Sequence, residues 1–220
     1  MSVFTYVLIV LGAVAAYFIG SINTAIIVSK SLSGDDIRDL GSGNAGMTNV
    51  LRNYGKKAGI LTFVGDAVKG MLSVIIMTLM LKGIKCEDEA LIMFSQYIAS
   101  LFALIGHVFP IYYKFKGGKG VSVSLGSVIL FDLPVAFVCL IGFIIVFLIT
   151  KMVSAGSVCA AILLPISTII FDVFVIHTNK CWLNVLVALL MAIVIILKHQ
   201  SNIKRILNGT ESKFSGHKGE

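Results

Sequence analysis

Six long apolar stretches run along this chain and limit its fold more than any other feature. They cover residues 3–29, 58–81, 90–113, 133–150, 155–172 and 182–197. A helix needs about 20 apolar residues to cross the hydrocarbon core of a bilayer, and a spanning segment must satisfy its own backbone hydrogen bonds. Only 13% of the residues are charged, about half the fraction found in a soluble domain. The sequence therefore predicts an all-α membrane protein with a single polytopic domain over residues 1–220.

A seventh apolar stretch, residues 121–131, decides the topology. As a helix it would reach only about 16 Å, against a hydrocarbon core of about 30 Å. If it crosses the membrane and the N-terminus lies outside, 14 lysines and arginines face the inside and 3 face the outside. If 121–150 is instead one span, the counts are 9 and 8. The positive-inside rule favours the first arrangement. We therefore predict seven transmembrane helices, the fourth of them short, with the N-terminus outside and the C-terminus cytoplasmic.

Under this topology most of the positive charge gathers on the inner face. The inner residues are Lys30, Arg38, Arg52, Lys56, Lys57, Lys114, Lys116, Lys119, Lys151, Lys198, Lys204, Arg205, Lys213 and Lys218. The outer residues are Lys82, Lys85 and Lys180. Cys86 and Cys181 also face outward. They either form a disulfide with each other or remain free thiols.

The segment GSGNAGMTN, residues 41–49, is polar and short of side chains between two apolar stretches. Its three glycines match G-x-G-x-x-G, but a dinucleotide site needs a strand before that motif, and here the flanks are predicted membrane helices. Glycines still let backbone N–H groups approach an anion closely. Ser42 adds a hydroxyl donor, and Arg52 can bind two phosphate oxygens. The segment is therefore either an anion site or a flexible turn between helices.

A second glycine-rich segment, GHVFPIYYKFKGGKGVS, covers residues 106–122. Gly117, Gly118 and Gly120 surround Lys119. This is not a Walker A loop, since Gly120 stands where Ser or Thr must follow the lysine. Two alternatives remain: a basic turn that binds an anion with its backbone, or juxtamembrane lysines that face lipid head groups. The adjacent glycines favour the first alternative, because lysines that only face lipid head groups do not require exposed backbone N–H groups.

A third polar segment, KHQSNIKRILNGTES, covers residues 198–212. His199 and Asn202 are three residues apart, so a helix would place them on one face. Within the second apolar stretch, Asp66 and Lys69 have the same spacing. Charges inside a membrane are costly and normally paired. We predict that these two form a mutual salt bridge that fixes the bundle, with a direct role in chemistry as the alternative.

The segments GSGNAGMTNVLRNYG, GHVFPIYYKFKGGKGV and KHQSNIKRILNGTE resemble the three motifs of the bacterial acyl-phosphate:glycerol-3-phosphate acyltransferases, and the resemblance runs from Gly20 to Glu211. It implies a bacterial inner-membrane enzyme whose active site faces the cytoplasm. That enzyme would transfer a fatty acyl group from acyl phosphate to sn-glycerol 3-phosphate, giving lysophosphatidic acid and inorganic phosphate, the first acylation of phospholipid synthesis. No cofactor and no metal are implied. The implied partners are the two substrates, membrane lipid and, by functional coupling, the enzyme that makes acyl phosphate, with no nucleic acid.

The resemblance also assigns roles by position. The implied catalytic residues are Ser42, Arg52, Lys119, His199 and Asn202. The implied phosphate-binding residues are Asn44, Thr48, Asn49, His107, Gly117, Gly118 and Gly120. Glu211 matches an acid of structural role in the family. Together with Asp66 and Lys69, it makes up the predicted structural residues. The chain departs from the family at Asn23, Met47 and Lys198, where proline, alanine and arginine are common, and none of these departures removes a group with obvious chemistry.

An acyl phosphate is already activated, so a protein that uses it needs mainly to position the substrates and neutralise charge. Three routes remain for the reaction: His199 as the base, the donor phosphate as the base, or a covalent intermediate on Ser42. We expect direct attack without an acyl-enzyme, since no base neighbours Ser42 in the sequence. A transporter of a phosphorylated solute or of a lipid is the competing function, although transporters usually carry coupling charges near the midplane and internal repeats.

Overall fold

The structure, a computed structural model, describes residues 3–176 and 181–214. Within these ranges every regular element is a helix. The α-helices are α1 (Val3–Gly20), α2 (Thr24–Ser33), α3 (Met47–Gly83), α4 (Glu89–Val108), α5 (Val121–Val128), α6 (Leu133–Thr150), α7 (Val153–Thr168), α8 (Cys181–Lys198) and α9 (Gln200–Leu207). The other helical elements are the 3-10 helices η1 (Ile37–Asp39) and η2 (Ile111–Tyr113) and the π-helix η3 (Ile169–Ile176). Lys180 and Lys218, which enter the charge count above, lie outside the described residues.

Six helical segments of the described chain are long and apolar enough to cross a membrane. They are Val3–Ser33, Met47–Gly83, Glu89–Tyr113, Leu133–Thr150, Val153–Asp172 and Cys181–Lys198. The prediction of an all-helical, multi-pass membrane protein is therefore confirmed. The predicted short helix exists as α5, but its 8 residues extend only about 12 Å, so six crossing helices are supported and the seventh is not. The side of the membrane that each terminus faces stays a prediction.

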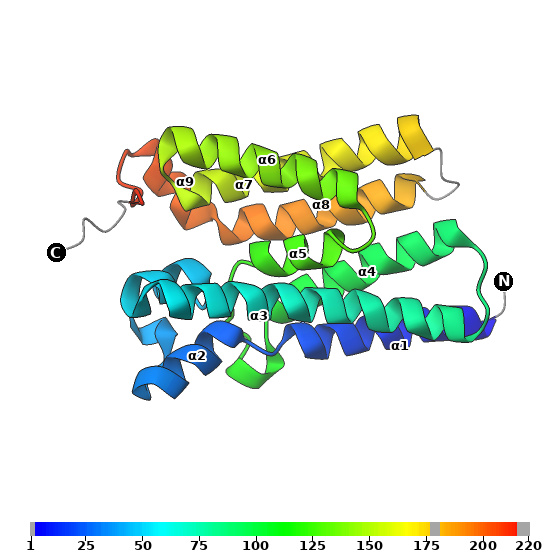
Figure 1. The fold of residues 1–220 in the computed structure, drawn as a ribbon, viewed down its shortest axis with the longest axis horizontal. Helices are drawn as coiled ribbons and strands as arrows, with labels where there is room; N and C mark the ends of the chain where they lie inside the picture. The colour runs from blue at the N-terminus through cyan, green and yellow to red at the C-terminus, as the bar shows by residue number, and fades with distance from the viewer. Residues whose placement is uncertain (1–2, 177–180, 215–220) are drawn as a thin grey trace.

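The helices form an elongated bundle in which α1 begins at one end and α9 lies at the other (Figure 1). α4 and α6 run in the same direction, and α5 returns the chain between them over part of the bundle's length (Figure 1). Val123, Gly126 and Val128 of α5 are buried. α5 needs no full crossing length because protein, rather than lipid, surrounds most of it.

Two glycines explain how α5 fits inside the bundle. A Cβ atom on Gly70 of α3 would collide with the carbonyl oxygen of Val123, and one on Gly126 of α5 would collide with that of Ala67. Without side chains at these positions the backbones of α3 and α5 come into direct contact. Such close approach at small residues is a common way for membrane helices to pack.

The apolar stretch 3–29 is two helices rather than the single segment that its hydropathy suggests. α1 ends at Gly20, and α2 begins after Asn23. The side-chain oxygen of Asn23 accepts a hydrogen bond from the N–H of Ile26 at 3.1 Å, which caps α2. A polar residue within an apolar run thus starts a new helix.

α3 begins at Met47, inside the first polar segment, well before the apolar stretch that predicted it. It changes direction at Gly55, whose φ of 82° suits glycine and strains other residues. The polar first part of α3 carries Arg52 to the end of the bundle, where α9 also lies.

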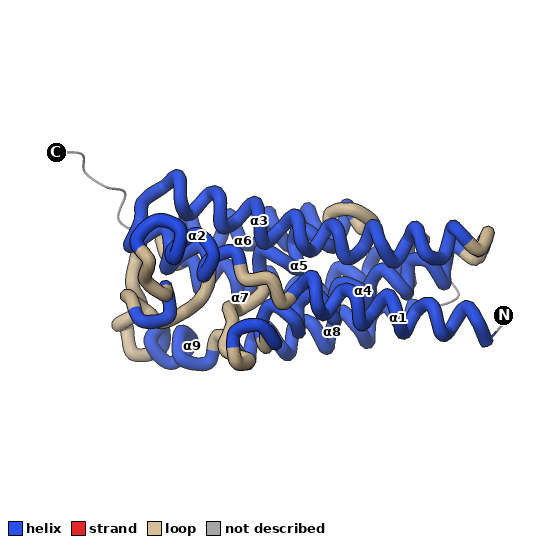
Figure 2. The backbone as a smooth tube through the Cα atoms, turned by 90° about the horizontal axis from the view of Figure 1, so that it is seen from below, coloured by secondary structure: helices blue, strands red, loops and turns tan. Residues whose placement is uncertain are grey.

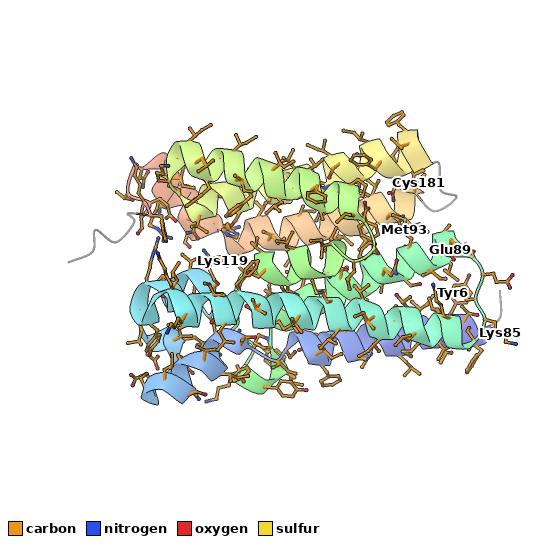
Figure 3. The ribbon with its side chains drawn as sticks, in the orientation of Figure 1. Tyr6, Lys85, Glu89, Met93, Lys119 and Cys181 are labelled. Atoms are coloured by element: carbon orange, nitrogen blue, oxygen red, sulfur yellow. The ribbon has the colours of Figure 1, made fainter. Side chains whose placement is uncertain are left out.

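Most loops gather at the end of the bundle that carries α2 and α9 (Figure 2). Lys119 lies toward this end, whereas Lys85, Glu89 and Cys181 lie at the other (Figure 3). Cys86 and Cys181 are free thiols, so the disulfide alternative is not realised in this structure.

Candidate active site

A cavity of about 930 Å³ opens among the three polar segments. Every residue with a predicted role in catalysis or phosphate binding lines it except Gly118. Of the predicted structural residues, Asp66 and Glu211 line it and Lys69 does not. Its deeper wall is apolar and comes from α5, α6, α7 and α8. The apolar side chains include Leu125, Val128, Leu140, Phe143, Leu164 and Ile195. The cavity thus joins a polar, cationic mouth to an apolar interior.

Asn49 organises the first polar loop. Its amide nitrogen donates to the carbonyl oxygens of Ile37 and Leu40 at 3.0 and 2.9 Å. Its oxygen accepts from the backbone N–H of Ser42 and from the side chain of Asn53, both at 3.1 Å. The polar atoms of Asn49 thus hold the loop in shape, while the phosphate-binding role of Asn49, which also lines the cavity, stays a prediction.

Ser42, Asn44 and Thr48 line the cavity mouth from the same loop and the start of α3. Within the described part of the chain, neither Ser42 Oγ nor the side-chain amide of Asn44 has a hydrogen-bond partner. Ser42 is exposed and Asn44 is half-buried. These groups are therefore available to a ligand, as their predicted roles require.

Two helices begin at this cavity without a side-chain cap. α3 starts after Gly46 and α5 after Gly120, and a glycine has no side chain that could bond the first N–H groups of its helix. Such unpaired N–H groups carry partial positive charge, and together they form a ready-made site for a phosphate. Arg52 lies in the first turns of α3, and Lys119 directly precedes Gly120. Each uncapped helix end therefore has a cation beside it.

Lys119 connects the second polar segment to the third. Its ammonium donates to the side-chain oxygen of Asn202, whose amide nitrogen donates to Glu211 Oε1 at 2.7 Å. Burial lowers the pKa of Lys119 to about 8, against the opposing effect of the Glu211 charge. The ammonium is thus mostly charged at neutral pH but poorly solvated, which strengthens its attraction for an anion.

Glu211 fixes the end of the described chain at the mouth of the cavity. Its carboxylate accepts hydrogen bonds from Ser154 Oγ at 2.6 Å and from Arg205 Nε at 2.7 Å, besides the one from Asn202. Burial acts to raise the pKa of this carboxyl, but the three hydrogen bonds outweigh it and the pKa falls. Next to Glu211, the carbonyl oxygen of Ser212 accepts from Arg52 at 3.4 Å. These contacts suit the structural role predicted for Glu211.

His199 is 2% exposed, and its Nδ1 lies 2.8 Å from the carbonyl oxygen of Ile195. A carbonyl can only accept, so Nδ1 carries the proton and Nε2 holds the free lone pair. Burial, followed by the charge of Lys119, lowers the pKa of His199 to about 4. His199 is therefore neutral at pH 7, with one nitrogen able to accept a hydrogen bond in the cavity that it lines.

Asp66, Lys69 and His107 form a buried polar cluster beneath the second segment. Lys69 pairs with Asp66 at 2.8 Å, which confirms the predicted salt bridge. The same ammonium lies 2.8 Å from His107 Nδ1. Because an ammonium can only donate, Nδ1 accepts and Nε2 of His107 carries the proton. His107 can therefore offer a ligand a donor but not a base.

Gly117 and Gly118 contribute packing rather than free amides. Their N–H groups donate to the carbonyl oxygens of Val108 and His107, both at 3.2 Å. A Cβ atom on Gly118 would overlap His107 Nε2 and would lie 2.5 Å from the carbonyl oxygen of Ala45. Both amides are bonded within the protein, so phosphate binding by these two glycines stays a prediction, with Gly117 in the cavity lining and Gly118 outside it.

Three residues that the sequence left without a role in the site lie in it or beside it. Ser154 donates to Glu211. Lys198 lines the cavity, with its ammonium 5.0 Å from the centre of the Phe109 ring. Arg38 bonds to the backbone of the second polar segment. Ser154 and Lys198 sit where apolar stretches end on the predicted inner face, which was the only sequence signal for them.

The cavity can hold two anionic groups close to an apolar chain. Arg52, Lys119 and Lys198 supply positive charge, and the two helix ends supply N–H donors. Within the described ranges, no three His, Cys, Asp or Glu side chains lie close enough together to hold a metal ion. A neutral histidine, His199, adds an acceptor for a hydroxyl group.

Known proteins resemble this chain both in sequence and in fold. The sequence model of the family described as glycerol-3-phosphate acyltransferase matches residues 10–209. A glycerol-3-phosphate acyltransferase of Clostridioides difficile (strain 630) is 41% identical, covering 99% of this chain and 100% of the relative. One of Bacillus subtilis (strain 168) is 43% identical, covering 94% of this chain and 97% of the relative.

A crystal structure of PlsY, an integral membrane glycerol 3-phosphate acyltransferase, in its glycerol 3-phosphate form has a TM-score of 0.78 to this chain at 32% identity. The match covers 94% of this chain and 96% of that one. From its motifs, its fold and these relatives, this chain belongs to the glycerol-3-phosphate acyltransferase family.

Proposed function

We propose that this chain transfers a fatty acyl group from acyl phosphate to sn-glycerol 3-phosphate, giving lysophosphatidic acid and inorganic phosphate. Family membership supports acylation of glycerol 3-phosphate, since the relatives carry that activity in their names. PlsY has also been solved in a form described as the lysophosphatidic acid form. The single observation that carries the proposal is the pair of uncapped helix N-termini that share one cavity with an apolar interior.

Two phosphate sites beside one apolar channel favour acyl phosphate as the donor. A helix N-terminus binds one phosphate group, so the ends of α3 and α5 can hold the phosphates of two small substrates. The apolar wall of α5 to α8 offers the fatty chain a path away from water. In a thioester donor the acyl carbonyl is bonded to sulfur, so a phosphate bound at the second helix end would not be the leaving group.

The chemistry then requires little beyond placement and charge neutralisation. The hydroxyl oxygen of glycerol 3-phosphate attacks the acyl carbonyl carbon, the new ester C–O bond forms, and the anhydride C–O bond to phosphate breaks. Arg52 and Lys119 stabilise the negative charge on the departing phosphate. His199 Nε2 accepts the hydrogen bond of the hydroxyl and so orients it. The departing phosphate takes the proton, because a histidine with a pKa of about 4 is a weak base.

We place this reaction at the inner membrane of a bacterial cell, with the cavity mouth facing the cytoplasm and all of residues 1–220 in one domain. The concentration of lysine and arginine on the predicted inner face supports this orientation. Family membership also removes the ground for the transporter alternative. An enzyme that makes acyl phosphate would be its functional partner.

Acyl transfer by purified protein in detergent tests the proposal, because no compartments exist there and transport cannot mimic turnover. Glycerol 3-phosphate is offered with palmitoyl phosphate, palmitoyl-CoA or palmitoyl-acyl carrier protein. We expect lysophosphatidic acid and inorganic phosphate in equal amounts from palmitoyl phosphate alone. Turnover with a thioester donor would overturn the donor assignment, and no turnover with any donor would overturn the acyltransferase.

A further inference from the structure

Arg38 joins the loop that carries Ser42 to the loop that carries Lys119, yet it does not line the cavity. Its Nη1 donates to the carbonyl oxygens of Tyr113 at 2.9 Å and Lys116 at 3.2 Å. These acceptors lie more than 70 residues away along the sequence. No other guanidinium of the described chain bonds to two carbonyl oxygens of this segment.

The guanidinium is itself held in place. Asp36 accepts from Arg38 Nε at 2.9 Å and from Nη2 at 2.7 Å, a two-pronged pair that fixes the plane of the group. The hydrogen bonds from Arg38 also lower the pKa of Asp36, so the carboxylate stays charged. Asn49 binds the carbonyl oxygen of Ile37, which ties the turn containing Arg38 to the start of α3.

The segment that Arg38 holds is strained. Lys114 and Phe115 both have left-handed backbones, with φ of 56° and 59°, and neither is glycine. Two consecutive residues of this kind are unfavourable for L-amino acids. The two carbonyl oxygens bound by Arg38 belong to Tyr113 and Lys116, the residues on either side of this pair. One guanidinium nitrogen therefore clamps the strained turn at both ends.

The strained turn lies three residues before Lys119 in the same loop. Directly after it, Gly117 and Gly118 bond to the end of α4, and Lys119 and Gly120 then lead into α5. A turn that relaxed would release this short connection at one end. Lys119 would move away from Asn202 and from the uncapped start of α5.

We infer that Arg38 is a positioning residue for the acyl transfer, which clamps the turn at residues 113–116 and so sets the position of Lys119 relative to the Ser42 loop. The inference rests on the proposed function of the cavity. It concerns a residue that touches neither the cavity nor a substrate placed in it.

The test uses Arg38→Gln and Arg38→Lys in the full-length protein, each alone and combined with Lys114→Gly and Phe115→Gly. Lysine keeps the charge but cannot hold Asp36 with two prongs and both carbonyl oxygens at once. We expect kcat/KM to fall by about 10- to 100-fold in both single variants, because small misplacements of a phosphate-binding group are costly. Glycine adopts the left-handed turn without strain, so the glycine pair should restore most of the lost activity.

The dependence of kcat/KM on pH distinguishes a positioning role of Arg38 from a general loss of folded protein. In the wild type, kcat/KM should decline above pH 8, near the pKa of Lys119. A Lys119 released into water regains its ordinary pKa, so the decline should move to higher pH in Arg38→Gln. Lys116→Gln is the matched control, since it removes a neighbouring exposed charge and keeps the bonded carbonyl. It should stay within about twofold of the wild type.

Two results would overturn the inference. One is wild-type kcat/KM in both Arg38 variants. The other is a loss of activity that the glycine pair does not restore and that leaves the pH profile unmoved, which would mark Arg38 as a general fold residue. Inactivity of the wild type itself would count against the proposed function instead, so the two failures are distinguishable.

Discussion

At the residue scale, burial lowers the pKa of Lys119, so the ability of this side chain to bind phosphate depends on pH. Its pKa of about 8 means that the ammonium is lost as the pH rises through that value. kcat/KM, which reports on free enzyme, should therefore fall above pH 8, while kcat should hold to higher pH because bound phosphate stabilises the ammonium. Lys119→Arg should remove the decline at a lower overall rate. A wild-type kcat/KM that stays flat to about pH 10 would contradict this prediction.

Ser42 is the residue that could form an acyl-enzyme, and among the described residues its hydroxyl makes no hydrogen bond to a basic side chain. We predict that the protein stays unmodified when it is incubated with palmitoyl phosphate alone. Intact-protein mass spectrometry measures this directly. Stoichiometric acylation at Ser42 would show a two-step reaction in place of direct attack.

Two accounts of Gly118, phosphate binding and packing, make different predictions for its substitution. The sequence suggested close approach of its amide to a phosphate, whereas the structure packs it against His107 and Ala45 with its amide already bonded. Gly118→Ala should therefore destabilise the fold by about 1–3 kcal/mol through overpacking. Gly83→Ala is the matched control, since no atom lies within 4 Å of its added Cβ.

Thermal unfolding in detergent, with KM for glycerol 3-phosphate measured below the unfolding range, distinguishes the two accounts of Gly118. A lower melting temperature for Gly118→Ala than for Gly83→Ala supports packing. Unchanged stability with a raised KM would return Gly118 to phosphate binding.

At the scale of elements, the site consists of helix ends as much as of side chains. Gly46 and Gly120 leave the first turns of α3 and α5 open, which costs helix stability and keeps N–H groups free for anions. From the sequence, both glycines belong to segments whose bare backbone can approach an anion, and nothing there placed them at the start of a helix. Their position at a helix start became visible only with the bounds of α3 and α5.

A cap introduced at the start of α3 tests this interpretation. The backbone at Gly46 is extended, so other residues can adopt it once the side-chain amide of Asn44, 2.9 Å from an added Cβ, shifts, and an aspartate side chain at this position would bond the free N–H groups. We expect Gly46→Asp to stabilise the protein by about 1 kcal/mol and to raise KM for one phosphate substrate by about tenfold. Gly46→Ala adds the same Cβ without a cap, so it should raise KM much less. Equal effects of the two changes on KM would contradict an anion site at this helix end.

The sequence predicted that α5 is a helix, but hydrophobic periodicity and length did not predict its position inside the bundle. Its apolar residues predicted a helix near 121–131, and α5 covers Val121–Val128. Its interior position depends on Gly70 and Gly126, which admit the neighbouring backbone. Neither glycine stands out in the sequence, because close contact between two helices is a property of the pair.

At the scale of the whole molecule, the remaining prediction is the orientation in the membrane. Lys116 belongs to the segment that carries Lys119, and Lys85 lies at the opposite end of the bundle (Figure 3). A membrane-impermeant thiol reagent applied to intact cells should label Lys85→Cys and spare Lys116→Cys. The unsubstituted protein gives the background from its four free cysteines. The reverse pattern would place the cavity mouth outside and contradict a cytoplasmic active site.

The sequence by itself determined the membrane class, the six apolar segments long enough to cross a bilayer, the Asp66–Lys69 pair and the three polar segments that line the cavity mouth. These features are local: hydropathy and spacing depend on neighbours in the chain, and a charged pair three residues apart in lipid has few other partners. Only the tertiary structure decided that the Gly117 and Gly118 amides are occupied, that Ser154 binds Glu211, and that Arg38 clamps the Lys119 loop. Each of those contacts joins segments far apart in the chain, so which donor meets which acceptor depends on how the helices pack.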